Sequence, residues 1–278
     1  MPCTRLLVAY DGTDFHGWQR QEPPGREPLR TVQGVLTEAL VQVVRRPVDL
    51  TGASRTDAGV HAKGQVAAFT GAHGVPLDRL PMALNARLPG DVRVLEAGPA
   101  PEGFDPISWA TSKCYRYHLA FGARQAEVPL LFERRTVWQT WHQLDVPRMQ
   151  AAAALLVGTH DFAGFAHATH TRPSTVRSIH GCTLWETGPG RAVMEIAGSG
   201  FLYNMVRIIA GTLVEVGRGA CAPDVVLEVL RTRNRELAGP TLPPHGLCLE
   251  WIAYDGPPRT DGGAAPADEG GPDDERQT

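Results

Sequence analysis

The residues best suited to chemistry in this 278-residue chain lie in one polar, glycine-flanked stretch at 52–62. It holds a single carboxylate, Asp57, with Arg55 two residues before it. A free aspartate has a pKa of about 3.9, so Asp57 can act near neutrality as a nucleophile or base without activation. Arg55, or an arginine from elsewhere, would keep this carboxylate charged inside a cleft. The simpler alternative is an Asx turn with a surface ion pair.

The elements around this loop are predicted from hydrophobic periodicity and turn residues. In the first half of the chain, an apolar stripe at helical spacing predicts a helix over 31–45, with Thr31 as its cap. The predicted elements of this half are strand 5–10, helix 31–45, strands 48–50 and 65–70, helix 77–88 and strand 92–95. Their order is β-α-β-β-α-β, and the polar loop joins the two middle strands.

The second half repeats this order with one additional helix. Its predicted elements are strand 115–121, helix 149–156, a hairpin of strands 177–185 and 192–196, helices 201–216 and 223–230, and strand 247–254. We therefore predict an α/β (α+β) fold of two split βαβ, RRM-like halves. Each half has an antiparallel sheet flanked by helices, and the active-site cleft lies between them. The predicted domains are 1–108 and 109–255, followed by a disordered acidic tail at 256–278.

Composition limits the class of protein. The cysteines are odd in number, scattered and without a Cys-x-x-Cys pair: Cys3, Cys114, Cys182, Cys221 and Cys248. They predict a reduced, cytoplasmic protein with neither a disulfide framework nor a cysteine zinc site. No apolar stretch approaches the length of a membrane span, and the apolar run at 6–9 is too short for a signal sequence. We therefore expect a soluble protein.

The net charge of −3 does not indicate a nucleic-acid partner until the tail is considered separately. Residues 256–278 hold two arginines and six acids, so the tail carries −4 and residues 1–255 carry +1. Apart from Lys63 and Lys113, the cations are arginines, which suit phosphates and stacked bases. Any basic surface is therefore expected to be local. Trp18, in a turn-rich loop with Arg20, either stacks on bases or folds under its own loop.

Several ordered motifs together carry a family resemblance. The polar loop reads SRTDAGVHA at 54–62, and a later motif reads FLYNMVR at 201–207. The full set of matching stretches is 10–13, 17–21, 54–62, 88–92, 113–117, 158–162, 201–207, 215–217 and 246–249. This set, spread over residues 5–254, resembles the TruA family of tRNA pseudouridine synthases.

The resemblance implies isomerisation of uridine to pseudouridine at positions 38, 39 and 40 of the tRNA anticodon stem-loop, without metal or organic cofactor. Asp57 matches the catalytic aspartate. Whether it attacks the sugar, removes a sugar proton or attacks the base ring stays open from sequence. Arg55 matches the residue that displaces the target base, which must leave its stack to be reached. Arg207 matches the arginine that pairs with the catalytic carboxylate.

The resemblance also implies the walls of the substrate pocket and the partners. Tyr115 matches the tyrosine that stacks on the flipped uracil, and Leu249 and Val206 form an apolar floor. On strand chemistry alone, Tyr115 is as well explained as a core residue. Members of the family are homodimers that hold one tRNA across both subunits, so we expect tRNA and a second copy as partners, and no membrane.

Two departures from the family pattern stand out. Ser54 occupies a position where glycine is usual. Residues 104–107 read Phe-Asp-Pro-Ile in place of a common Phe-His-Ala-Arg, so Asp105 and Ile107 replace a histidine and an arginine. This change puts in doubt a tRNA-backbone contact near the domain junction and leaves the catalytic residues untouched.

Two other functions compete with the synthase. A metal-dependent hydrolase would use His160, Asp161, His167 and His170, although their spacing on a Gly/Ala/Thr-rich loop does not place them on one helical face. A catalytically silent RNA-binding module is the second, since paired split βαβ sheets serve as RNA platforms. The presence of Asp57, Tyr115 and Arg207 argues against this module.

Overall fold

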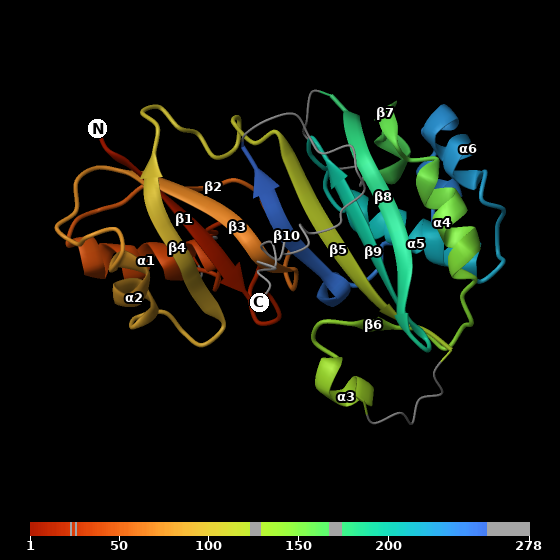
Figure 1. Cartoon of the computed structure of the whole chain (residues 1–278), viewed down its shortest axis with the longest axis horizontal. Helices are drawn as coiled ribbons and strands as arrows, with labels where there is room; N and C mark the ends of the chain where they lie inside the picture. The colour runs from red at the N-terminus through yellow and green to blue at the C-terminus, as the bar shows by residue number, and fades with distance from the viewer. Residues whose placement is uncertain (23, 26, 123–128, 167–173, 255–278) are drawn as a thin grey trace, which may run out of the picture.

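The structure is a computed structural model that describes residues 1–254 apart from 23, 26, 123–128 and 167–173. Its described strands form one mixed ten-stranded sheet with the order β4-β1-β3-β10-β5-β9-β8-β7, where β2 pairs with β3 and β6 with β5 (Figure 1). The predicted disordered tail at 256–278 lies outside the described residues.

The N-terminal half supplies one end of this sheet. Its elements are β1 (Cys3–Tyr10), α1 (Val32–Val44), β2 (Leu50–Gly52), β3 (His61–Thr70), α2 (Leu80–Asn85) and β4 (Val92–Ala100). The predicted cap of α1 is present, because the side chain of Thr31 accepts a hydrogen bond from the amide of Gly34. The predicted order β-α-β-β-α-β is confirmed for this half.

The C-terminal half supplies the other end. Its elements are β5 (Ser112–Ala120), α3 (Pro129–Glu133), β6 (Trp138–Gln139), α4 (Val146–Ala154), β7 (Gly158–Asp161), β8 (Val176–Gly188), β9 (Arg191–Gly198), α5 (Met205–Gly217), α6 (Val225–Thr232) and β10 (Leu247–Ala253). Short 3-10 turns lie at Ala163–Phe165, Arg235–Leu237 and Pro244–Gly246. The sequence did not predict α3, β6 and β7, which are short and carry little periodicity.

The α/β fold class is confirmed, and the two predicted sheets prove to be parts of one. Strand β10 pairs antiparallel with β5 of its own half and parallel with β3 of the other, through Cys248 opposite His61 and Leu249 opposite Ala62. Strand β10, the last strand of the described residues, therefore joins the two halves. The domain boundary predicted at 108/109 falls between β4 and β5 and stays a prediction.

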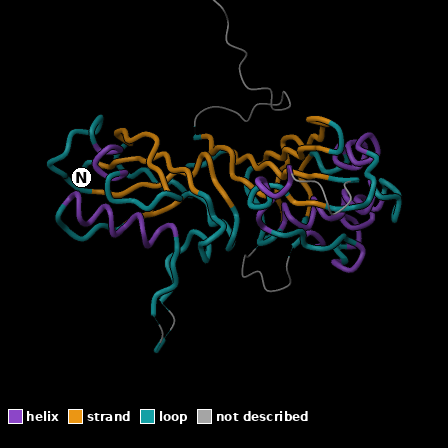
Figure 2. Tube along the Cα trace, turned by 90° about the horizontal axis from the view of Figure 1, so that it is seen from below, coloured by secondary structure: helices purple, strands orange, loops and turns teal. Residues whose placement is uncertain are grey.

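Most of the helices lie on one side of the sheet (Figure 2). Helix α5 is nearly all apolar and packs against the C-terminal strands and α4, so Ile208, Ile209 and Leu213 are fully buried. The sequence predicted this helix from residue 201. It begins at Met205 because Asn204 adopts a left-handed conformation with a φ of 61°, which excludes it from the helix. In the described part of the chain, no helix is long and apolar enough to cross a membrane.

The join between the halves depends on a close backbone contact at Gly64 on β3. A Cβ there would lie 2.2 Å from the carbonyl oxygen of Glu250 on β10. We therefore expect Gly64→Ala to lower the free energy of unfolding by roughly 2–3 kcal/mol, because backbone must move to admit the methyl group. Chemical denaturation would measure this. Gly74→Ala is the matched control, since no atom lies within 4 Å of its added Cβ, and equal effects of both changes would contradict the prediction.

Candidate active site

The polar loop predicted to carry chemistry connects β2 to β3. These strands pair antiparallel, with Gly52 opposite Ala67, so the loop leaves and re-enters the sheet at the same edge. The amide of Val60 donates to the carbonyl of Asp57 at 3.1 Å and closes the turn. This arrangement projects Asp57 away from β3 and toward the C-terminal half.

A buried glutamine holds the start of the loop. The side chain of Gln65 on β3 is fully buried, donates to the carbonyl oxygen of Ser54 at 2.6 Å and accepts from the Ser54 amide at 3.2 Å. Both polar groups of one loop residue are thus satisfied by one side chain. A glutamine in the otherwise apolar run 65–69 was the sequence signal for this role, and the sequence analysis overlooked it.

Trp18 packs against Gly52 at the start of the loop, and its ring is too deeply buried to stack on bases. It is 1% exposed, and a Cβ on Gly52 would lie 2.3 Å from its ring, so the glycine makes room for the indole. Of the two roles left open by sequence, folding under its own loop is correct. Beside it, the hydroxyl groups of Tyr10 and Thr56 are hydrogen-bonded at 2.8 Å.

Buried His61 fixes the end of the loop. Its Nδ1 accepts from the amide of Gly12 at 3.1 Å, and its Nε2 lies 2.7 Å from the carbonyl oxygen of Arg135. The same Nδ1 lies 3.1 Å from Asp11 Oδ1, so both ring nitrogens have polar partners. His61 therefore orders the loop.

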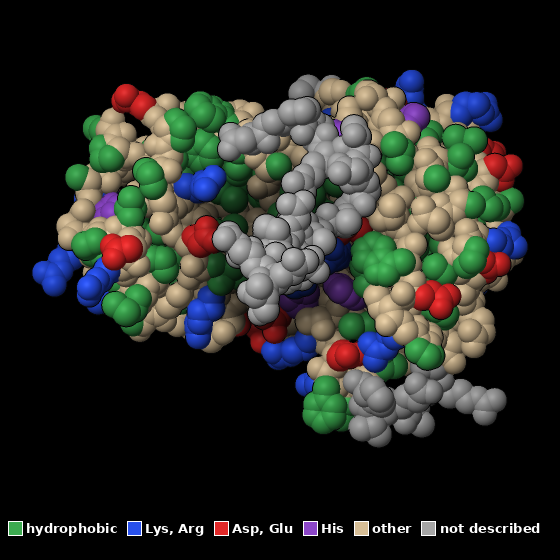
Figure 3. All heavy atoms as spheres, in the orientation of Figure 1, with side chains coloured by type: hydrophobic (Ala, Val, Ile, Leu, Met, Phe, Trp, Pro, Cys, Tyr) green, Lys and Arg blue, Asp and Glu red, His purple; other side chains and the backbone are tan. Residues whose placement is uncertain are grey.

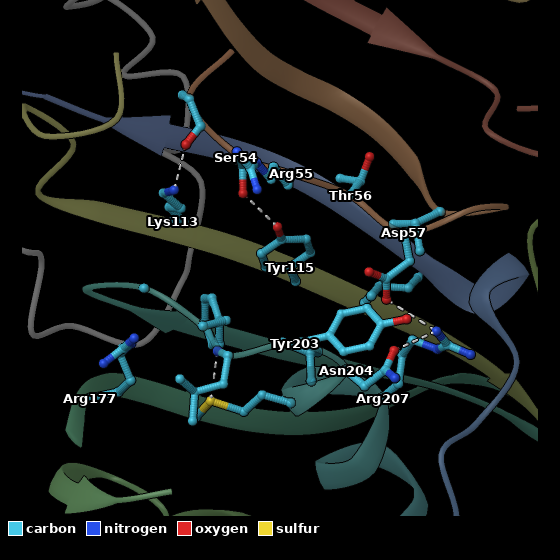
Figure 4. Close-up of a pocket in the computed structure, with 18 of the residues that line it drawn as sticks. Ser54, Arg55, Thr56, Asp57, Lys113, Tyr115, Arg177, Tyr203, Asn204 and Arg207 are labelled. Atoms are coloured by element: carbon cyan, nitrogen blue, oxygen red, sulfur yellow. Dashed lines mark hydrogen bonds and ion pairs between the residues drawn. The ribbon is translucent and has the colours of Figure 1, made fainter. Parts of the chain in front are cut away.

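Asp57 faces Arg207, which lies in the first turn of α5. Arg207 Nη1 donates to Asp57 Oδ2 at 3.1 Å and to Asn204 Oδ1 at 2.8 Å, and Arg207 Nε donates to the carbonyl of Leu242 at 2.7 Å (Figure 4). The guanidinium is thus held by three partners. The arginine that forms an ion pair with Asp57 is therefore Arg207, from the other half of the chain. Asn204 positions the Arg207 guanidinium, a role that the sequence analysis did not name.

Burial and ion pairing act on Asp57 in opposite directions. Burial raises the pKa of the carboxyl group above its usual value, while the charge and hydrogen bond of Arg207 lower it again. Burial is the larger of these effects. Asp57 is therefore a partly buried carboxylate with a cationic partner, which is a suitable state for a nucleophile or base.

Tyr115 on β5 forms the wall next to Asp57. Its ring packs edge-on against Phe201 with centroids 5.3 Å apart, and its hydroxyl is hydrogen-bonded to Ser54 Oγ at 2.9 Å. Burial raises the pKa of Tyr115 to about 12, with a contribution from the nearby charge of Asp57, so the phenol is neutral. Ser54, the departure from the usual glycine, has acquired a contact with the wall of the pocket.

These side chains surround a cavity of about 760 Å³ between the two halves. Of the predicted site residues, Asp57, Arg55, Arg207, Tyr115 and Val206 line it, and Arg55 is exposed. Leu249 is fully buried beneath the site, and Leu247 on the same strand lines the cavity in its place. The lining also includes two cations that were not predicted, Lys113 and Arg177.

The other departure from the family pattern, at residues 104–107, lies at the edge of the cavity. Ile107 is 49% exposed and lines the cavity. Asp105 is turned back into its own loop, where its carboxylate accepts from the amide of Ile107 at 2.9 Å and from Ser108 Oγ at 2.7 Å. Asp105 is thus the acceptor of an Asx turn.

The residues proposed for a metal-dependent hydrolase do not form a metal site in the described structure. Asp161 accepts from Thr175 Oγ1 at 2.6 Å and pairs with Arg233 at 3.0 Å, and His160 Nε2 lies near the carbonyl of Val157. Across the described ranges, no group of three His, Cys, Asp or Glu side chains is placed to hold a metal. His167 and His170 lie outside those ranges.

The cavity combines a paired carboxylate, an aromatic wall and several cations. A flat ring can stack on Tyr115 while the carboxylate reaches an electrophilic carbon or an acidic proton. Cations around the same space suit phosphate groups. These features are typical of an enzyme that acts on a nucleotide.

Comparison with known proteins agrees with this class. The family model described as tRNA pseudouridine synthase matches residues 6–106 and 152–255. The tRNA pseudouridine synthase A of Myxococcus xanthus is 42% identical, covering 97% of this chain and 99% of that protein. The proteins of the same name from Halalkalibacterium halodurans and Moorella thermoacetica are 45% and 41% identical, over 87% and 91% of this chain and 89% and 100% of theirs.

The chain therefore belongs to the tRNA pseudouridine synthase family. The matched segments carry both sides of the active-site pair, since Asp57 lies in the first and Arg207 in the second.

The support under the loop can be tested through Gln65. We expect Gln65→Leu to lower the free energy of unfolding by about 2–3 kcal/mol, because the amide and carbonyl of Ser54 lose their buried partner. Denaturant titration would measure the change. Gln42→Leu, at an exposed position on α1, should stay within about 0.5 kcal/mol of the parent protein. A Gln65→Leu protein as stable as the Gln42→Leu protein would disprove the role of this side chain.

Proposed function

We propose that this protein isomerises uridine to pseudouridine in the tRNA anticodon stem-loop, at positions 38, 39 and 40, with Asp57 as the nucleophile. The observation that carries the proposal is the ion pair between Asp57 and Arg207 inside a cavity walled by Tyr115. Membership of the synthase family supports the same reaction.

The reaction is an isomerisation and needs no external reactant. The bond between N1 of uracil and C1′ of ribose breaks, uracil rotates, and a bond forms between C5 and C1′. The hydrogen on C5 leaves as a proton and N1 gains a proton, so the atoms balance. The Asp57 carboxylate starts this sequence, by attack on the sugar, by removal of a sugar proton or by attack on the base ring. Each of these routes needs a charged, poorly hydrated carboxylate, and its contact with Arg207 supports such a state.

The remaining site residues hold the target in place. Arg55 is proposed to displace the uridine from its stack, and its exposure beside the cavity supports that role. Tyr115 stacks on the extruded uracil, and its neutral hydroxyl stays bonded to Ser54. Val206 and Leu249 belong to the apolar floor, with Val206 lining the cavity and buried Leu249 directly opposite Tyr115 in the pairing of β10 with β5.

The partners and the location belong to the same proposal. The substrate is tRNA, bound by a homodimer in the cytoplasm, in a reaction that uses no metal or organic cofactor. All five cysteines are free thiols, which supports a reducing compartment. The two halves, 1–108 and 109–255, form the two sides of the cleft. The first half carries Asp57, and the second carries Arg207 and Tyr115.

The decisive experiment uses tRNA labelled with tritium at C5 of uridine. We expect the parent protein to release tritium from the anticodon arm, and Asp57→Asn to bind tRNA with similar affinity while releasing none, because the amide is no nucleophile. Mapping of the modified positions completes the test. Turnover by the Asp57→Asn protein would refute the assignment of Asp57, and tRNA binding without turnover by the parent would favour a silent RNA-binding module.

The pH dependence tests the ion pair. Since the active form is the carboxylate, kcat/KM should fall as the pH falls through the pKa of Asp57. Arg207 lowers this pKa, so Arg207→Met should raise it and move the acidic limb of the profile to higher pH. Arg207→Lys retains the charge and should move the limb less. An acidic limb at the same pH in all three proteins would show that Arg207 does not act on Asp57.

A further inference from the structure

Several cations line the cavity in addition to Arg207. Among the described residues that line it, Asp57 is the only acid, and it is paired with Arg207. Three further cations line the same space, namely Arg55, Lys113 and Arg177. Lys113 and Arg177 are half-buried, and Figure 4 places both at the end of the cavity away from the Asp57–Arg207 pair.

Strand pairing places Lys113 and Arg177 on one face of the sheet. Lys113 on β5 lies opposite Gly198 on β9, and Gly198 lies opposite Ile179 on β8. Residues directly opposite one another point to the same face, as do residues two apart on a strand. Arg177 therefore shares a face with Lys113 and also with Tyr115. Two strand spacings, about 10 Å in all, separate the backbones of β5 and β8.

Small residues line the cavity near Arg177. Ser199 and Gly200 line the cavity there, and a Cβ on Gly200 would lie 3.9 Å from Nε of Arg177. Both cations are held in place. Lys113 Nζ donates to the carbonyl of Ala53 at 2.7 Å, and Arg177 Nη1 donates to the carbonyls of Ser174 and Val176 on its own chain segment.

We infer that Lys113 and Arg177 form a phosphate site for the phosphodiester that adjoins the target uridine. The inference rests on the proposed function, because a nucleotide turned out of its stack carries its flanking phosphates to the mouth of the pocket. With uracil on Tyr115, the sugar-phosphate backbone follows the same face of β5 toward Lys113. Two half-buried cations on one face, with Ser199 and Gly200 lining the same cavity, suit the single negative charge of a phosphodiester.

The charges on the face drawn in Figure 3 are consistent with a local site. On the face drawn in Figure 3, Lys and Arg side chains are interspersed with Asp and Glu side chains and form no continuous basic field outside the part that grey atoms cover. Residues 1–255 carry a net charge of only +1. Long-range attraction is therefore weak, and cations concentrated in the cavity supply the phosphate contacts that position the substrate.

The test combines a change in the protein with a change in the RNA. The probes are anticodon stem-loop RNAs with one neutral methylphosphonate linkage immediately 5′ or 3′ of the target uridine. For the parent protein, we expect one of the two to lower kcat/KM about tenfold, because a charged hydrogen-bonded contact is lost. For Arg177→Met, the same neutral linkage should change kcat/KM less than twofold, and the salt slope of RNA binding should fall by about 1.

Arg177 carries the test because the two hydrogen bonds named above join it to backbone carbonyls of its own segment. Lys113→Met removes the contact with Ala53 as well and should also lower kcat, whereas Lys113→Arg restores the response to the neutral linkage. Arg231→Met, at an exposed position on α6, is the matched control and should keep the tenfold response. Thermal melting confirms that each variant is folded.

Binding of the same RNAs to the Asp57→Asn protein separates this inference from the proposed function. A neutral linkage that weakens binding about tenfold supports the phosphate site even if no isomerisation is detected. If turnover by the parent protein is normal and Arg177→Met responds to the neutral linkage as strongly as the parent does, the phosphate site is refuted and the proposed function stands.

Discussion

The structure depends on the parallel contact between β3 and β10. This contact is short, with two residue pairs. It joins β10 to β3, the strand that follows the polar loop. Gly64 permits the close approach, and the ion pair of Lys63 with Glu250 at 3.1 Å extends the contact along the two strands. Because β10 also pairs with β5, the loop that carries Asp57 is held at a fixed position relative to Tyr115. Without this join, the two sides of the cavity would belong to separate sheets.

Electrostatics in the cavity follow from that arrangement. Asp57 is partly buried where the halves meet, which raises its pKa, and the same arrangement brings Arg207 to within 3.1 Å, which lowers the pKa. A partly buried charge is costly without a partner, so each of the two residues offsets part of the desolvation cost of the other. The site therefore exists only in the assembled fold, where desolvation keeps the carboxylate reactive and the guanidinium keeps it charged. Asn204 and Leu242 fix the guanidinium through two further hydrogen bonds.

The polar loop is rigid because buried side chains satisfy its backbone. Gln65 binds both polar groups of Ser54, and His61 holds the loop against the backbones of Gly12 and Arg135. Trp18 fills the space that Gly52 leaves. Each of these side chains costs free energy to desolvate and recovers it through hydrogen bonds or packing. Their common effect is to hold Asp57 in one position before substrate arrives, so that less ordering is left to binding.

The sequence by itself determined the element order, most of the helices and strands, and the loop around Asp57, because hydrophobic periodicity, caps and turn residues act over a few positions. Short elements such as β6 and β7 carry too little hydrophobic periodicity to be predicted. The left-handed conformation of Asn204 makes α5 begin at Met205, four residues after the predicted start at 201. From residue types alone, either Arg55 or an arginine from elsewhere could pair with Asp57, and only the family resemblance pointed to Arg207. Trp18 likewise had two roles open to it. Only the tertiary structure decided these points, because it alone brings together residues such as Asp57 and Arg207, which are 150 positions apart in the chain.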